Sequence, residues 1–155
     1  MNHEESKLQQ QCVAWFRMQY PQYAMLLTHP ANEGNGNRVT GAIHKAEGTT
    51  PGIPDLLLFV PAEFDCMYCG LGLELKTASG RQSKQQKDFQ QMFQAAGYCY
   101  IVIRSLDEFR LHVNVWLEHV PEYIRQAVAS TNKQLADDDL QRQRDKLQRI
   151  ISRKQ

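Results

Sequence analysis

The sequence lacks the features that mark membrane, secreted or strongly basic proteins. No apolar run approaches the roughly 18 residues that a membrane-spanning helix needs. The start of the chain, MNHEESKLQQQ, has neither the basic residues nor the apolar segment of a signal peptide. The formal net charge is only +1, so no overall field favours binding of nucleic acid or of a membrane surface. We therefore expect an intracellular protein with no membrane partner.

Cysteine is also scarce, with four residues in the chain. In an intracellular protein these are expected to be free thiols. Cys66 and Cys69 have the spacing of half a zinc site, but there is no second pair of this kind. The alternatives are a structural zinc site and a hairpin turn with two incidental cysteines.

The chain is long enough for one domain with a core of its own, since it has 155 residues, 42% hydrophobic and 23% charged. Its charge is uneven along the sequence. We predict one domain over residues 1–120 and a helical, basic extension over residues 121–155. The last fifteen residues hold one acid, Asp145, and six bases: Arg142, Arg144, Lys146, Arg149, Arg153 and Lys154.

Hydrophobic periodicity predicts an alternation of helices and strands. Helices are expected over residues 4–20, 83–96 and 106–120, then a short one after Pro121 and a polar one from residue 131. Strands are expected over residues 23–29, 55–60, 70–76 and 98–104, with a hairpin connection at 61–69. The long connection at 30–54 is expected to be functional or to contain a short helix, at 38–47. This order predicts an α/β protein with a small mixed β-sheet flanked by helices and a C-terminal helical extension.

Two carboxylates and a lysine stand out on neighbouring strands. Asp55 opens one strand, and Glu74 and Lys76 share one face of the next, opposite three alternating leucines. Gly72 is expected to leave that face uncrowded. If the strands pair, Asp55 and Glu74 converge, and they repel unless a cation lies between them or one takes up a proton.

Such oxygen ligands suit Mg²⁺ or Mn²⁺. A metal of this kind lowers the pKa of a bound water, and a neighbouring lysine can orient that water or offset developing charge. The alternative is a solvated Glu–Lys pair at a sheet edge, because E-x-K alone is a weak pattern.

The residues around this pair resemble a known nuclease family. Pro54-Asp55 followed by Glu74-Leu75-Lys76 looks like the PD-(D/E)XK signature. The segments GTTPGIPDLLLF, LELKTASGRQSKQQ and AAGYCYIVIRSLDE together resemble the VRR-NUC family of virus-type replication and repair nucleases. HPANEG is similar to that family's P-N-x-G loop, although Ala31 intervenes. The resemblance covers residues 4–119.

The resemblance implies a restriction-endonuclease-like core and a role for individual residues. Asp55 and Glu74 would bind the metal together with the backbone carbonyl of Leu75, and Lys76 would be the catalytic lysine. Glu5, or alternatively Glu4, would add a carboxylate from the first helix. Gln86 matches a helix glutamine close to the active site. Replacing Asp55 or Lys76 by alanine is expected to abolish cleavage and to leave the fold intact.

The same resemblance implies a metal-dependent DNA endonuclease encoded by a bacterium or a phage, in the cytoplasm or nucleoid. We expect a homodimer that selects branched DNA of the Holliday-junction type during replication, repair or recombination. The alternative is a non-catalytic DNA-binding or assembly module with the same fold. The C-terminal extension would either dimerise the chain or contact DNA. Residues expected to contact DNA are Arg81, Lys84 and Lys87 at a helix start and Asn32 and Arg38 in the long loop; solvated surface residues are the alternative.

Overall fold

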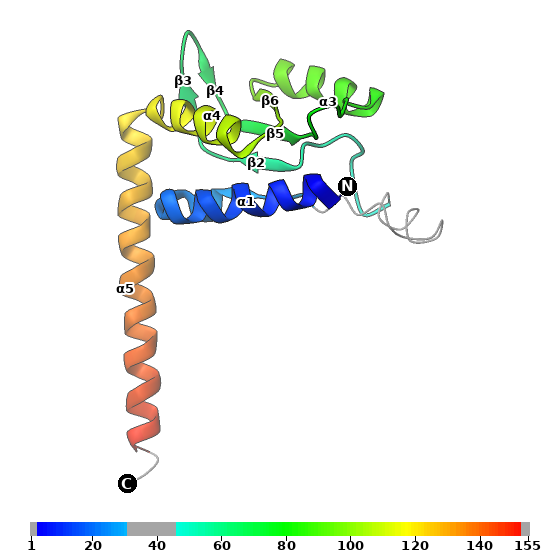
Figure 1. Cartoon of the computed structure of the whole chain (residues 1–155). Coiled ribbons are helices and arrows are strands. Elements are labelled where there is room, and N and C mark those ends of the chain that lie inside the picture. Colours follow the sequence, from blue (N-terminus) through cyan, green and yellow to red (C-terminus); the bar gives the residue numbers. More distant parts are fainter. Residues whose placement is uncertain (1–2, 31–45, 153–155) are drawn as a thin grey trace. The chain divides into compact units, whose positions relative to one another are not determined.

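The computed structural model of the chain describes residues 3–30 and 46–152. The chain divides into two compact units, Met1–Pro121 and Glu122–Gln155. The first unit contains all strands of the described residues, and the second is a single helix (Figure 1). Every element that forms the candidate site belongs to the first unit.

The first unit is built on a mixed four-stranded sheet in the order β1-β2-β5-β6. The neighbouring pairs β1–β2 and β2–β5 are antiparallel, whereas β5–β6 is parallel. The parallel pair is connected through helix α3, which gives the crossover that parallel strands require. The sheet strands are β1 Leu27–Thr28, β2 Leu56–Leu58, β5 Leu71–Leu75 and β6 Cys99–Ile103.

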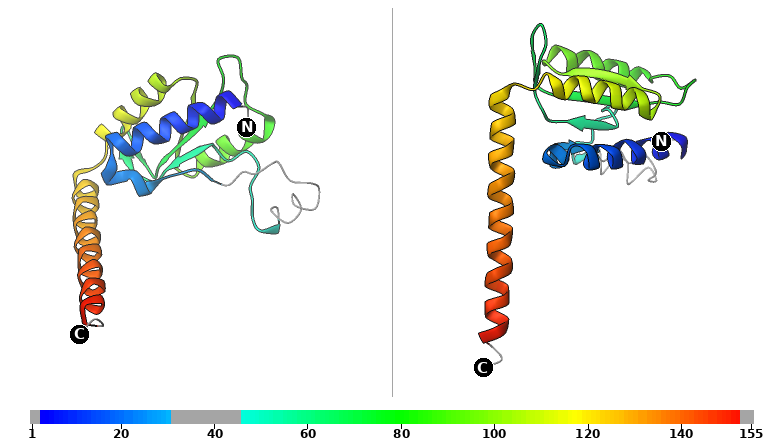
Figure 2. Two further views of the ribbon diagram at one scale, coloured as in Figure 1. Left: turned by 60° about the horizontal axis from the view of Figure 1, so that its bottom comes forward. Right: turned by 60° about the vertical axis from the view of Figure 1, so that its left-hand side comes forward.

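Helices cover both faces of this sheet (Figure 2). Helices α1 (His3–Gln19) and α4 (Leu106–Glu118) contact each other on one face, where the rings of Trp15 and Phe109 meet edge to face with their centroids 5.9 Å apart. Helix α3 (Lys84–Ala95) lies on the other face, and Phe93 packs there beside Tyr100 of β6. The mixed sheet flanked by helices that the sequence predicts is therefore confirmed.

Strand β5 is buried on both faces, and not on one alone. All five of its residues are buried. A Cβ atom at Gly72 would lie 2.9 Å from the Phe93 ring and 3.0 Å from Pro54. The expectation that Gly72 leaves its face uncrowded is wrong, because the missing side chain instead lets Phe93 and Pro54 close over the strand.

The segment at 23–29 also differs from its prediction as a strand. It lies mostly in a 3₁₀ helix, η1 (Pro21–Leu26), and only Leu27–Thr28 pairs in the sheet. Pro21 stands in the first turn of this helix, where its fixed φ angle and missing N–H are tolerated. A short apolar run does not distinguish strand from helix by its periodicity. The hairpin at 61–69 does form, from β3 (Ala62–Glu63) and β4 (Met67–Tyr68).

The second unit is one continuous helix, α5 (Glu122–Ser152), of 31 residues. The sequence predicts a short helix and then a second helix from residue 131. No break occurs at Thr131, whose hydroxyl donates to the carbonyl of Ala127 at 2.9 Å, one turn back, as a threonine within a helix can do. Gln134 likewise donates to Asp138 at 2.9 Å, four residues on, which supports the polar stretch as helix. Within the described ranges no helix has both the length and the apolar character needed to span a membrane.

Candidate active site

The strand register brings Asp55 and Glu74 together. Leu56 pairs with Leu73 in the antiparallel β2–β5 ladder, so one further step places Asp55 opposite Glu74. At the two ends of β5, the carbonyl of Gly70 accepts from Cys99 and the N–H of Lys76 donates to Ile103. The backbone N–H and C=O groups of the even-numbered residues of this strand therefore point toward β6, and those of the odd-numbered residues toward β2. The Asp55–Glu74 position is consequently a non-hydrogen-bonded one, where opposed side chains approach most closely on one face.

The backbone at this end of the ladder is left open by Pro54. One more step in the same register opposes Pro54 to Leu75, and proline has no N–H to give to the Leu75 carbonyl. The N–H of Leu75 donates instead to Oδ2 of Asp55 at 2.8 Å. The N–H and C=O of one strand residue point to the same side, so the Leu75 carbonyl faces the side on which Asp55 lies.

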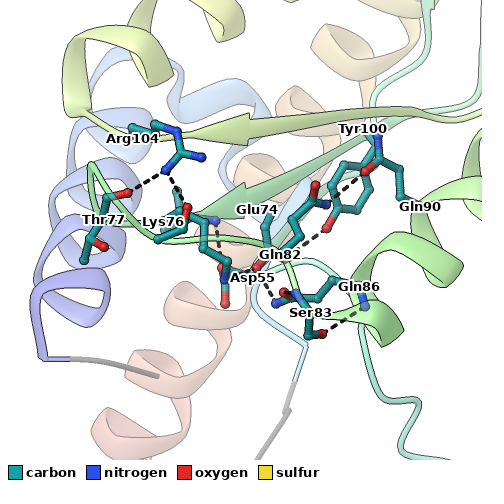
Figure 3. A network of polar contacts seen from close by, with 12 residues as sticks. Asp55, Glu74, Lys76, Thr77, Gln82, Ser83, Gln86, Gln90, Tyr100 and Arg104 are labelled. Carbon is teal, nitrogen blue, oxygen red and sulfur yellow. Dashed lines mark hydrogen bonds and ion pairs between the residues drawn. The ribbon is translucent and has the colours of Figure 1, made fainter.

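Glu74 is buried and accepts hydrogen bonds from three side chains (Figure 3). Its Oε1 accepts from Lys76 Nζ at 2.5 Å and from Gln86 Nε2 at 2.5 Å. Its Oε2 accepts from the Tyr100 hydroxyl at 3.0 Å. A carboxylate has about four lone-pair positions, so this network fixes the orientation of Glu74 and leaves room for about one further ligand.

Burial raises the pKa of both carboxylates, because it penalises their charged forms. For Asp55, the Leu75 N–H and the Lys76 ammonium oppose this effect on the pKa, while the negative charge of Glu5 adds to it. For Glu74, the charge of Asp55 raises the pKa further, and Lys76 lowers it. One ammonium group thus faces a buried carboxylate, Glu74, and a half-buried one, Asp55, and the excess negative charge suits a divalent cation.

Lys76 is held in place along its whole length. Its residue exposure is only 8%, and its backbone N–H donates to the Ile103 carbonyl at 2.9 Å. The loop that follows turns tightly over the lysine, since a Cβ atom at Gly80 would lie 3.3 Å from Lys76 Cδ. Arg104 closes this loop by donating from Nη1 to the carbonyls of Thr77, at 2.6 Å, and Gly80, at 2.9 Å.

Gln86 reaches Glu74 from the first turn of α3. Ser83 caps this helix, and Gln86 completes a capping box with it. Gly52 lies directly against the same turn, because a Cβ atom there would come within 2.3 Å of the Gln85 carbonyl oxygen. The φ angle of Gly52, +88°, is also one that favours glycine. The backbone at Gly52, three residues before Asp55, therefore packs directly against the backbone of Gln85 and Gln86.

The sequence analysis missed two residues of this network, Tyr100 and Arg104. Tyr100 is buried on β6, opposite Gly72 in the parallel register. Burial and the charge of Glu74 raise its pKa far above the ordinary value, so it is a neutral donor. The available signal was the alternation of strand residues 98–104, which puts Tyr100 on one face; only the register shows that this is the face of Glu74.

The structure brings the remaining predicted site residues to different places. Glu5 is half-buried in α1 and close enough to Asp55 to raise its pKa, whereas Glu4 is exposed. A residue that was not among the predicted site residues also lies here: His29 follows β1, and its Nδ1 is 2.7 Å from the backbone carbonyl oxygen of Asp55. Arg81, Lys84 and Lys87 are exposed around the start of α3 and do not join the buried network. Asn32 and Arg38 lie outside the described residues, as does most of the helix predicted at 38–47.

Other metal-binding arrangements find no support in the described part of the chain. Cys66 and Cys69 are exposed free thiols on the β3–β4 hairpin. Among residues 3–30 and 46–152, no three His, Cys, Asp or Glu side chains are grouped so that they could hold a metal. A cation at Asp55 and Glu74 would therefore complete its shell with the Leu75 carbonyl, water or substrate oxygens.

Comparison with known proteins identifies the fold. No protein-family profile and no curated protein matches the sequence. A solved structure described as a "VRR_NUC domain protein" superposes with a TM-score of 0.65 at 20% identity, over 77% of this chain and 93% of that one. The chain therefore has a VRR-NUC-like fold over the matched part, and at this identity the likeness shows the fold alone.

Proposed function

We propose that the chain is a divalent-metal-dependent endodeoxyribonuclease that hydrolyses phosphodiester bonds. The observation that carries this proposal is the opposition of Asp55 and Glu74 across β2 and β5, with the Lys76 ammonium 2.5 Å from Glu74 Oε1. Two carboxylates and an open backbone carbonyl on a nuclease fold form a donor set of hard oxygens that suits Mg²⁺ or Mn²⁺, and a lysine lies beside them.

Asp55, Glu74 and the Leu75 carbonyl would hold the metal. When bound, the metal polarises a phosphoryl oxygen and lowers the pKa of water at the site. Lys76, buried and aimed at the same point, offsets negative charge that develops on the phosphate in the transition state. Gln86 and Tyr100 keep Glu74 in the orientation that presents its remaining lone pair. Glu5 adds negative charge from α1.

DNA would approach from the side of the α3 N-terminus. Arg81, Lys84 and Lys87 are exposed there, and a helix N-terminus with basic side chains favours phosphate. Asn32 and Arg38 of the long loop are further proposed contacts. The basic part of α5 would either contact DNA or pair with a second copy of the chain; a homodimer would bring two sites to opposing strands of a branched junction. We propose Holliday-junction-type or other branched DNA as the substrate, in replication, repair or recombination.

A panel of end-labelled substrates tests this function: four-way junction, flap, and linear duplex of the same sequence, each with Mg²⁺, Mn²⁺ or chelator. We expect metal-dependent cuts at the branch point, and none with Asp55→Asn. Equal cutting of linear duplex would contradict the proposed selectivity but not the chemistry. Binding of the junction without cutting in any metal would contradict the nuclease and favour the non-catalytic module. Sedimentation of the same preparation tests the homodimer, which a monomer would contradict.

A further inference from the structure

The capping box of α3 and the candidate active site share one side chain, that of Gln86. Its backbone N–H donates to Ser83 Oγ at 3.2 Å, and its side-chain Oε1 accepts from the Ser83 N–H at 2.8 Å. These two bonds are the reciprocal pair that caps the helix. The other end of the same carboxamide, Nε2, donates to Glu74 Oε1 at 2.5 Å.

We propose that Ser83 is a positioning residue of the active site, acting through Gln86 on Glu74. This inference rests on the proposed function, in which Glu74 is a metal-binding carboxylate. The cap of α3 would then have a second role, which is to keep the NH₂ group of the Gln86 side chain in contact with the Glu74 carboxylate.

The chemistry of the two ends of the carboxamide requires this orientation. A flipped Gln86 would turn its carbonyl oxygen toward the Glu74 carboxylate and its NH₂ toward the Ser83 N–H. Both contacts would then be repulsive, acceptor against acceptor and donor against donor. The backbone N–H of Ser83 therefore selects the orientation, and the Ser83 hydroxyl, by accepting from the Gln86 N–H, holds the capping turn that places this N–H. Figure 3 shows the chain of contacts from Ser83 through Gln86 to Glu74.

The position of the turn is fixed from its other side as well. Gly52 lies against the backbone of Gln85 and Gln86, where a Cβ atom would be 2.9 Å from the Gln86 nitrogen. Asp55 follows three residues after Gly52. The first turn of α3 thus supports both carboxylates. It supports Asp55 by packing against Gly52, three residues earlier in the chain, and it supports Glu74 through the side chain of Gln86.

The chain offers a matched control in α4. Ser105 caps that helix in the same way, accepting from the Glu108 N–H at 3.1 Å. Glu108 returns a bond to the N–H of Arg104 at 2.7 Å. Neither Ser105 nor Glu108 contacts Glu74 in the hydrogen bonds of the described residues. Ser105→Ala therefore removes a serine cap of the same kind without touching Gln86.

The experiment compares the full-length wild type with Ser83→Ala, Ser83→Thr, Gln86→Ala, the double variant Ser83→Ala/Gln86→Ala, and Ser105→Ala. The readouts are the melting temperature, the Kd for Mn²⁺, and kcat and KM for junction cleavage. Ser83→Ala and Ser105→Ala should lower the melting temperature to a similar extent. Only Ser83→Ala should weaken Mn²⁺ binding, by about tenfold, and lower kcat, because Gln86, the partner of a metal ligand, is then no longer held in place. Ser83→Thr should restore both.

The double variant separates positioning from general destabilisation. If Ser83 acts through Gln86, removing it in the Gln86→Ala background should change neither the Mn²⁺ Kd nor kcat any further. Additive losses, or equal Mn²⁺ affinities for Ser83→Ala and Ser105→Ala, would overturn the proposal.

Failure of the proposed function is recognised separately. A wild type that binds Mn²⁺ but cuts no DNA contradicts the nuclease, and the Mn²⁺ data then decide the role of Ser83. If the wild type bound no Mn²⁺, the side-chain NH₂ resonances of Gln86, observed by NMR without metal or DNA, would decide it. A shift and faster solvent exchange on Ser83→Ala would support positioning, whereas unchanged resonances would overturn it.

Discussion

Two lysine–carboxylate pairs of nearly equal length lie in contrasting parts of the first unit. On β5, Lys76 Nζ is 2.5 Å from Glu74 Oε1, and the two side chains are 10% and 0% exposed. On the outer side of α3, Lys84 Nζ is 2.6 Å from Asp88 Oδ2, and the side chains are 87% and 57% exposed. Distance does not distinguish these pairs, but the cost of taking charge out of water does.

The buried pair exists only because neighbouring groups support it. Gln86 and Tyr100 supply the hydrogen bonds that water gives freely to Asp88. A second carboxylate, Asp55, raises the pKa of Glu74 despite the lysine. A protein that needed only an ion pair would gain little from this arrangement, so the comparison favours a site that is incomplete without a cation.

The largest expected difference is in Lys76→Met against Lys84→Met. Lys76→Met leaves a buried carboxylate without its ammonium, and should lower the free energy of unfolding by about 3 kcal/mol or more. The same variant tests the expectation from the sequence that loss of Lys76 leaves the fold intact, because Lys76 contacts the buried Glu74. Chemical denaturation of the two variants at pH 8 measures the difference, and equal losses would remove the basis of the comparison.

A smaller effect is expected from Tyr100→Phe. This change removes one donor to Glu74 Oε2 and keeps the ring packed against Phe93. Hydrogen bonds to charged groups contribute about 1.5–3 kcal/mol, so a loss of about 1.5 kcal/mol is expected. Denaturation curves measure it, and Tyr98→Phe, just before the same strand, is the control. A loss below that of the control would mean that the tyrosine does not support Glu74.

The repulsion between Asp55 and Glu74 should be visible as a dependence of stability on pH. Both carboxyl groups have a pKa raised above the ordinary values of 3.8 and 4.5. The folded state then holds protons that the unfolded state has released, so their contribution to stability is present below pH 4 and is lost as the pH rises through the raised values.

Asp55→Asn should reduce this loss and make the metal-free protein more stable than the wild type at pH 8, by about 1 kcal/mol, while cleavage disappears. Thermal unfolding of both proteins in chelator from pH 4 to pH 8 tests the prediction. Parallel curves for the two proteins would show that Asp55 and Glu74 do not repel each other.

The smallest effect is expected for Lys84→Ala on α3. An exposed i,i+4 pair contributes about 0.3–0.5 kcal/mol, so unfolding should hardly change. If Lys84 contacts a phosphate, DNA affinity should fall and the slope of log K against log salt should decrease by about one. An unchanged salt slope would place Lys84 outside the DNA contact.

The sequence predicted much of this arrangement because its signals are local. The pairing of the two strands with Asp55 and Glu74 follows from apolar runs that flank a hairpin connection, and the start of α3 follows from the periodicity of residues 83–96. Tyr100 and Arg104 were missed because their roles depend on a parallel register across a helical crossover. The face of Gly72 was misjudged for the same reason, since Phe93 comes from a distant helix. The break predicted at residue 131 is absent, because the polar residues that follow it continue the helix with bonds between side chains four residues apart, such as Gln134 to Asp138.

The central claim is that Asp55 and Glu74 form one divalent-metal site. Titration of Mn²⁺, followed by the loss of the free-ion EPR signal, tests it most directly in wild type, Asp55→Asn and the surface control Asp88→Asn. We predict saturable binding of one Mn²⁺ per chain, lost in Asp55→Asn and kept in Asp88→Asn. Binding of the same affinity in wild type and Asp55→Asn, or none in wild type, would contradict the account.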